Sequence, residues 1–186
     1  DLEPNPAFTV RRARLGAIAW VNPWVKSQVE LELAGTTALV DAFVVASPRP
    51  EIALTMGQFR VPFSRQNRLP SKHFQLPDAA YFVAPKYLVD RDIGAMLSGE
   101  LFGKRLSWYL GMFNGNDPGA NQLDNNDPYF LFAARVEAAP LGPVPRFEGD
   151  LRKLEERVDP KVAVGAGWMH NRLEDKHFNR TCLGAD

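Results

Sequence analysis

The sequence has one cysteine, no net charge and no long apolar run, and these absences exclude several classes of protein. Cys182 is the only cysteine in 186 residues, so it is either an incidental free thiol or the partner of a cysteine outside this chain. Basic and acidic residues number 22 each, which gives no overall field to favour nucleic acid or anionic lipid. No apolar run reaches the ~18 residues of a transmembrane helix.

Catalytic and metal-binding patterns are also missing. His73, His170 and His177 are scattered, and no metal-ligand spacing links them. The sequence contains no nucleophile–base pairing, no phosphate loop and no paired-carboxylate motif. We therefore expect a protein that is not an enzyme and has no metal, no cofactor and no nucleic-acid partner.

What the chain has instead is alternation with a period of two. In K-S-Q-V-E-L-E-L-A-G (26–35), Val29, Leu31 and Leu33 alternate with polar residues, which is typical of a strand with one apolar and one polar face. In a soluble sandwich the apolar face meets a core, whereas in an outer-membrane barrel it meets lipid. One strand does not decide between the two.

Eight segments carry strand patterns, and most are eight to ten residues long, close to the ~9–11 residues of a membrane-spanning strand. Their polar faces carry Arg, Glu, Asp and Gly, which a dry sandwich core would not accept and a wet lumen would. The sequence therefore predicts an all-β protein, an antiparallel transmembrane β-barrel. The predicted strands are 8–21, 25–33, 38–46, 52–61, 92–101, 106–113, 130–138 and 162–169.

The connections alternate between short and long, as they do in bacterial barrels. The segments 62–91, 114–129 and 171–186 form the long, outer set, and 171–186 is expected to be an open tail. The segments 47–51, 102–105 and 140–161 form the periplasmic set, and 150–158 reads as a short helix or a charged turn. Because the first strand must then run downward from the outside, we expect residues 1–186 to be a single barrel domain that is incomplete at both ends.

A set of motifs in a fixed order resembles the phosphate-selective porin O/P family of outer-membrane channels. The motifs are FTVRRARLGAIAW (8–20), GQFRVPFSRQ (57–66), DRDIGAMLSGE (90–100), LSWYLGMFNGN (106–116) and NDPYFLFAARVEAAPLGP (126–143). The resemblance implies a sixteen-stranded barrel, usually a homotrimer, in the bacterial outer membrane with its lipid and lipopolysaccharide. It also implies passage of small anions such as phosphate through a basic lumen.

Six basic residues are candidates for lining the pore or binding anions. Alternation directs Arg12, Arg14 and Arg135 inward, where a guanidinium can hydrogen-bond a passing oxyanion. The alternative for Arg12 and Arg14 is a bond to lipopolysaccharide or to a lumen carboxylate such as Glu30 or Glu32. The candidates in the long segment are Arg65, Arg68 and Lys72.

The long segment 62–91 is either an ordinary extracellular loop or a loop folded into the lumen. We expect infolding, because its apolar residues need cover that a solvated loop would not give them. The leading prediction of function is a water-filled channel for passive diffusion of small solutes. The alternatives are a barrel with a plugged lumen that serves as a structural or assembly partner, and a soluble β-sandwich binding module.

Overall fold

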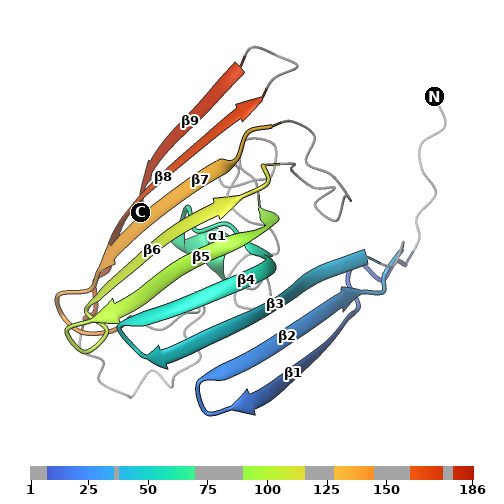
Figure 1. Cartoon of the computed structure of the whole chain (residues 1–186), viewed down its shortest axis with the longest axis horizontal. Coiled ribbons are helices and arrows are strands. Elements are labelled where there is room, and N and C mark those ends of the chain that lie inside the picture. The colour runs from blue at the N-terminus through green and yellow to red at the C-terminus, as the bar shows by residue number, and fades with distance from the viewer. Residues whose placement is uncertain (1–7, 36–37, 70–89, 116–127, 145–159, 174–177) are drawn as a thin grey trace.

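The structure, a computed structural model, shows in the residues that it describes one curved antiparallel sheet and one short helix (Figure 1). It describes residues 8–35, 38–69, 90–115, 128–144, 160–173 and 178–186. The predicted helix or charged turn at 150–158 lies outside these residues. So do Lys72 and most of the segments 62–91 and 114–129.

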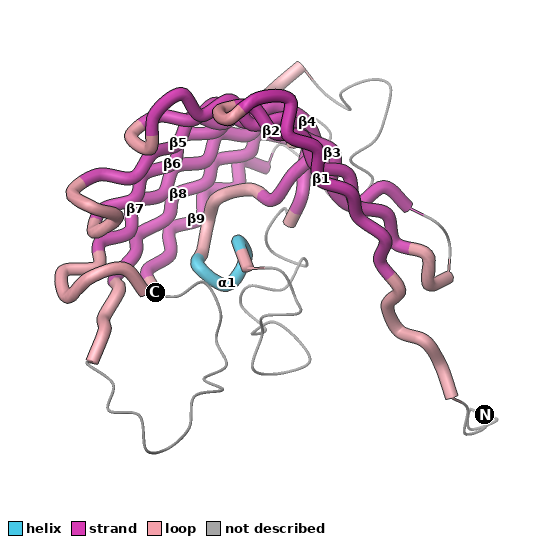
Figure 2. The backbone as a smooth tube through the Cα atoms, turned by 90° about the horizontal axis from the view of Figure 1, so that it is seen from below, coloured by secondary structure: helices cyan, strands magenta, loops and turns pink. Residues whose placement is uncertain are grey.

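Nine strands follow one another in the sheet in the order of the sequence, and each is antiparallel to its neighbours. The strands β1 and β9 are the two edges and do not pair with each other, so the described sheet is open. Figure 2 shows that it bends into a trough with α1 (Arg65–Arg68) on the concave side. The strands are β1 Arg14–Asn22, β2 Val25–Glu32, β3 Ala38–Arg49, β4 Ile52–Arg60, β5 Arg91–Leu101, β6 Leu106–Phe113, β7 Leu131–Ala138, β8 Val164–Leu173 and β9 Phe178–Ala185.

The all-β antiparallel class and the eight predicted strands are confirmed, with shifts at their ends. The largest shift is in β1, which begins at Arg14 rather than at residue 8. The expectation of an open tail at 171–186 was wrong, because residues 171–173 extend β8 and residues 178–185 form β9. The pairing of β9 with β8 satisfies backbone groups that a free tail would leave to water.

The connections between the strands are divided between the two ends of the sheet. The tight turns 23–24, 50–51 and 102–105 lie at one end together with the long connection 139–163, and the segments 33–37, 61–90 and 114–130 lie at the other. Local chemistry explains the first turn, where Asn22 Oδ1 accepts hydrogen bonds from the backbone N–H groups of Trp24 (2.9 Å) and Val25 (2.8 Å). We call this the short-turn end.

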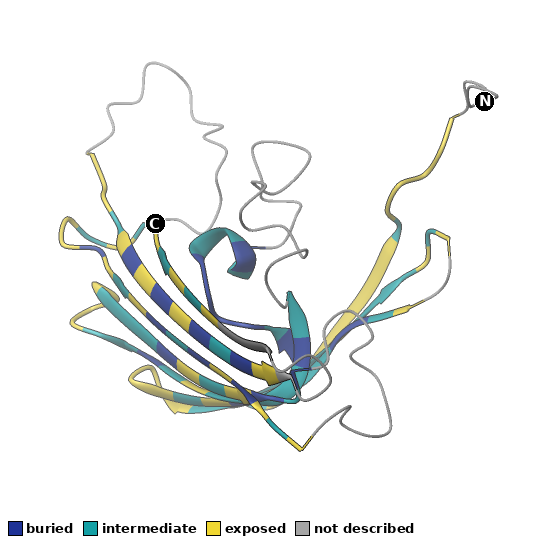
Figure 3. Ribbon diagram, turned by 90° about the horizontal axis from the view of Figure 1, so that it is seen from above, coloured by how far each residue is buried: buried dark blue, intermediate teal, exposed yellow. Residues whose placement is uncertain are grey.

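The register places one row of apolar side chains from the nine strands on the convex face. In β1 and β2, for example, Leu15 lies opposite Leu31 and Ala17 lies opposite Val29. Nothing among the described residues covers this face, and many of its large side chains are between 38 and 79% exposed (Figure 3). They are Leu15, Val29, Val44, Leu54, Met56, Leu97, Leu110, Met112, Phe132, Val136, Val164, Trp168 and Leu183.

The buried core is small and lies on the concave face. The ring of Phe59 meets those of Phe43 and Phe113 edge-on, with centroids 6.0 and 5.3 Å apart. The segment that follows β4 adds Val61 and Phe63 to this cluster. The members of the core are Phe59, Val61, Phe63, Phe113, Leu131, Ala133 and Met169.

Candidate functional site on the concave face

The feature that dominates the concave face is residues 61–69, which we call the latch. The latch leaves the end of β4 and returns across the trough to β8 and β9. Its side chains are largely buried: Val61 is 0% exposed, Leu69 3% and Asn67 4%. A nine-residue segment buried this deeply is held by contacts along its whole length.

Polar contacts within the latch fix its shape. Ser64 caps α1, because its Oγ accepts a hydrogen bond of 2.9 Å from the backbone N–H of Asn67. The Asn67 side chain donates to the Val61 carbonyl at 2.9 Å, and Arg60 donates to the Asn67 carbonyl at 2.7 Å. These bonds satisfy backbone groups that would otherwise be buried without partners.

Phe63 attaches the latch to the far side of the sheet. Its backbone and ring lie over Gly167 of β8 and Gly184 of β9. A Cβ at Gly184 would come within 2.9 Å of the ring, and a Cβ at Gly167 would collide with the carbonyl of Phe63. The two glycines therefore form a notch that admits Phe63 only because they have no side chains.

Arg135 of β7 lies beneath the latch and binds it by charge-assisted hydrogen bonds. Its guanidinium donates to the Phe63 carbonyl at 3.0 Å, to Glu137 at 2.8 Å and to Asp186 at 2.7 Å. Arg65 completes this cluster, since its guanidinium donates to Glu137 at 2.8 Å and its backbone N–H to Asp186 at 2.6 Å. The Arg135 side chain is 1% exposed, so the ion pairs compensate a charge removed from water.

The last contact of α1 is made by Arg68, whose guanidinium lies 3.6 Å from the centre of the Tyr109 ring. Tyr109 projects from β6 and is 5% exposed. A guanidinium over an aromatic face at this distance is a cation–π contact. Arg68 thus holds the end of the latch against the sheet near the short-turn end.

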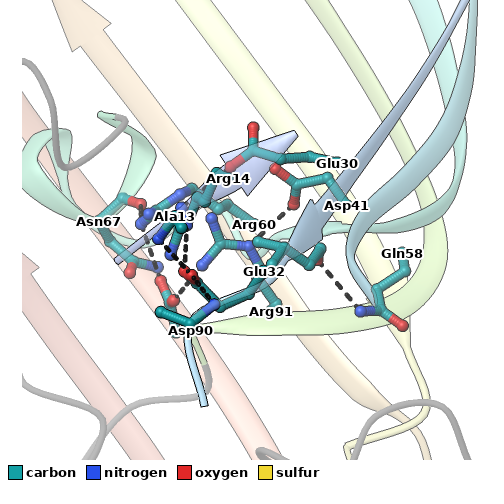
Figure 4. Close-up of polar contacts among 12 residues, drawn as sticks. Ala13, Arg14, Glu30, Glu32, Asp41, Gln58, Arg60, Asn67, Asp90 and Arg91 are labelled. Carbon is teal, nitrogen blue, oxygen red and sulfur yellow. Dashed lines mark hydrogen bonds and ion pairs between the residues drawn. The ribbon is translucent and has the colours of Figure 1, made fainter. Parts of the chain in front are cut away.

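A second ion-pair cluster lies on the concave side of β1 to β5 (Figure 4). Arg14 donates to Glu30 at 3.0 Å and to Glu32 at 2.9 Å. Next to it, Arg91 bridges Asp41 at 2.8 Å and Asp90 at 2.6 Å, and Asp90 also pairs with Arg60 at 2.9 Å. Every arginine of this cluster is therefore matched by at least one carboxylate.

Four of the six predicted site residues lie on the concave side of the described structure. Arg14 pairs with Glu30 and Glu32, the carboxylates that the sequence analysis gave as its alternative partners. Arg65 and Arg135 both pair with Glu137. Arg68 stacks on Tyr109. Arg12 precedes β1 and is exposed, and Lys72 lies outside the described residues. Binding of anions by these residues stays a prediction.

Sequence reasoning missed several residues that build this site. Phe63, Asn67 and Asp186 were not singled out, although they fix the latch in place. One signal was available: Gly165 and Gly167 alternate on the inward face of β8, and glycine inside a strand marks a close approach of other backbone. The sequence does not tell which segment approaches.

Among the described residues, no helix is long and apolar enough to cross a membrane. That part of the chain also holds no group of three or more His, Cys, Asp and Glu side chains placed to bind a metal ion. No protein-family model, curated protein or solved structure matches the chain.

Proposed function

We propose that this chain forms part of the wall of an outer-membrane β-barrel channel through which small solutes diffuse passively. The observation that carries the proposal is the distribution of residues over the two faces. Large apolar side chains stand exposed on the convex face of every strand, while the ion pairs are on the concave face. This inside-out pattern suits lipid outside and water inside.

Strand length and connectivity support the same proposal. The strands have 8–12 residues, near the ~9–11 that cross a bilayer and above the ~5–6 usual in globular sheets. The sequential antiparallel meander is the strand order of bacterial barrels, and three tight turns, 23–24, 50–51 and 102–105, lie at one end of it, as such barrels have at their periplasmic side. The resemblance of five ordered motifs to the phosphate-selective porin O/P family agrees with it, and a homotrimer is proposed on the resemblance alone.

A soluble β-sandwich is the less favoured function, because it needs a second layer over the apolar face. No described residue supplies that layer. A barrel with a plugged lumen is favoured by one observation, namely that the latch occupies the concave face and is tied to it by Arg65 and Arg135. The plug and the channel differ in whether ions pass.

Single-channel recording in planar bilayers separates these functions. The protein at its full natural length, purified in detergent, is expected to give discrete conductance steps and heat-modifiable migration in gels. Heat-modifiable migration without conductance would favour the plugged barrel. A protein that stays folded and monodisperse without detergent would overturn both barrel proposals.

The substitution Leu110→Arg tests the lipid contact directly. Leu110 lies in the middle of β6 on the convex face and is 55% exposed. If this face meets lipid, the arginine lowers the free energy of unfolding by ~2–4 kcal/mol, whereas on a water-facing surface the change stays within ~0.5 kcal/mol. Urea titration in liposomes measures the difference. Leu141→Arg is the matched control, since Leu141 is 58% exposed but lies in a connection.

Preference for anions is the finer part of the proposal, and it depends on Arg65 and Arg68 at the latch. Changing both to glutamine should move the reversal potential in a salt gradient towards that of a cation-selective channel. The shift should be larger near 0.1 M salt than near 1 M, because the screening length falls from ~10 Å to ~3 Å. Arg49→Gln, at an exposed position at the end of β3, is the control. A wild-type channel that selects cations would remove the anion assignment and leave the channel.

A further inference from the structure

A cavity of about 500 Å³ opens on the concave face at the short-turn end of the sheet. It lies between the β1–β2 hairpin, the strands β3 to β6, and the end of the latch. None of the ion pairs of Arg14, Arg91 or Arg135 contributes to its lining. The cavity is therefore separate from the clusters that hold the latch.

The cavity combines an open aromatic surface with an excess of positive charge. Trp20 of β1 is 65% exposed although its position is on the concave side, where lipid would not cover it. Lys26 lies directly opposite on β2, with its ammonium 5.8 Å from the centre of the Trp20 ring. In the described part of the chain Lys26 forms no ion pair, so its charge faces the cavity uncompensated.

The other charged residues of the lining keep the balance positive. Among the described residues of the lining, Lys104 and Arg68 are the other cations, and Glu100 is a carboxylate. Glu100 lies 3.6 Å from Lys104, and Arg68 lies flat on Tyr109. Because Lys104 is paired with Glu100, the charge that the described lining offers to a solute next to Trp20 is the ammonium of Lys26, which favours an anionic solute.

We propose that this cavity binds aromatic carboxylates, with the ring of the solute on the indole of Trp20 and its carboxylate at Lys26. Rings stack on tryptophan in offset or edge-on geometry, and an ammonium next to the ring supplies the counter-ion. Inorganic phosphate would gain nothing from the indole. A neutral sugar would leave the charge of Lys26 unused. This proposal rests on the proposed channel function for one point, that the cavity lies in the channel lumen; binding of the solute itself does not require a channel.

The probe is 4-fluorobenzoate, observed by ¹⁹F NMR with the full-length protein in detergent. Its signal should broaden on binding, while the uncharged 4-fluorobenzamide should broaden far less. Unlabelled benzoate should displace the probe, whereas equal concentrations of phosphate or glucose should not. Equal binding of the amide, or equal displacement by phosphate, would overturn recognition of an aromatic carboxylate.

Two substitutions locate the binding. Trp20→Ala should weaken it by about two- to tenfold, the usual contribution of an aromatic pair, and Lys26→Met by about tenfold. Trp20→Phe keeps a ring and should retain most of the affinity, which separates stacking from misfolding. Trp168→Ala, on the convex face, and Lys161→Met, outside the strands, are matched controls. Unchanged binding in both Trp20→Ala and Lys26→Met would place the site elsewhere and sink the proposal.

The binding measurement needs no transport, so the two proposals can fail separately. A protein that conducts ions but does not bind 4-fluorobenzoate would overturn only the cavity proposal. A protein that binds the probe without forming channels would overturn the channel proposal. The cavity would then be a binding site within a plugged barrel.

Discussion

Replacing Arg135 with leucine is expected to lower the free energy of unfolding by about 3–5 kcal/mol, the cost of breaking a buried ion pair by removing one partner. Arg135 is 1% exposed at its side chain and joins the Phe63 carbonyl, Glu137 and Asp186. Its loss leaves two carboxylates facing each other beneath the latch, with Arg65 as their remaining cation. Urea titration in detergent or liposomes, followed by gel mobility, measures the change.

A matched control shows whether the effect belongs to the cluster. Arg49→Leu removes the same side chain from an exposed position at the end of β3 and should change the free energy of unfolding by less than ~0.5 kcal/mol. Adding Asp186→Asn to Arg135→Leu should recover part of the loss, because Asp186 loses its ion pair with Arg135 whereas Glu137 keeps its ion pair with Arg65. A loss below ~1 kcal/mol for Arg135→Leu would mean that the cluster is solvated and does not hold the latch.

Replacing Phe63 with alanine is expected to free the latch, at a cost of about 3 kcal/mol. Phe63 is 7% exposed, and its ring fills the notch over Gly167 and Gly184. Because none of the strand pairs of the sheet involves the latch, we expect the loss to appear first as local opening of the latch. Hydrogen exchange at the amides of Val61 and Phe63, which donate to Asp90 and Val61 carbonyls, should accelerate by about a hundredfold.

Three further variants show whether the effect of Phe63→Ala comes from emptying the notch or from the loss of any apolar side chain. Phe63→Leu should cost less than Phe63→Ala, and Phe8→Ala, outside the sheet and fully exposed, should leave exchange in the latch unchanged. Gly167→Val should mimic Phe63→Ala, because the added side chain collides with the Phe63 carbonyl. If the protein forms an open channel, Phe63→Ala and Gly167→Val should both raise the conductance, because both free the latch. Unaltered protection of Val61 in Phe63→Ala would show that polar contacts alone fix the latch.

Much of the sheet could be predicted from sequence because local alternation determines it. The pattern of Val29 and Leu31 against Glu30 and Glu32 assigns both faces of β2 without knowledge of its neighbours. The strand β9 escaped prediction because Thr181, Leu183 and Ala185 put only one large apolar side chain on its outward face. The two faces of β9 differ so little in hydrophobicity that the strand is recognised only from its pairing with β8 in the structure.

The site was less predictable than the sheet, since its contacts join distant residues. Pairing of Arg14 with Glu30 and Glu32 follows from two adjacent strands, and it was foreseen as an alternative. The contact between Arg65 and Asp186 spans 121 residues and depends on the latch crossing several strands. No spacing in the sequence encodes that path, so only the curvature of the sheet brings Arg135 and Phe63 together.

The sequential pairing of the nine strands also bears on the order of folding. Each strand pairs with the one before it, so the sheet can grow hairpin by hairpin through contacts of short sequence separation. The latch is different, because its bonds to Glu137 and Asp186 close loops of 72 and 121 residues. It should therefore dock after β8 and β9 have joined the sheet, as a late step that slows unfolding without speeding the assembly of the sheet.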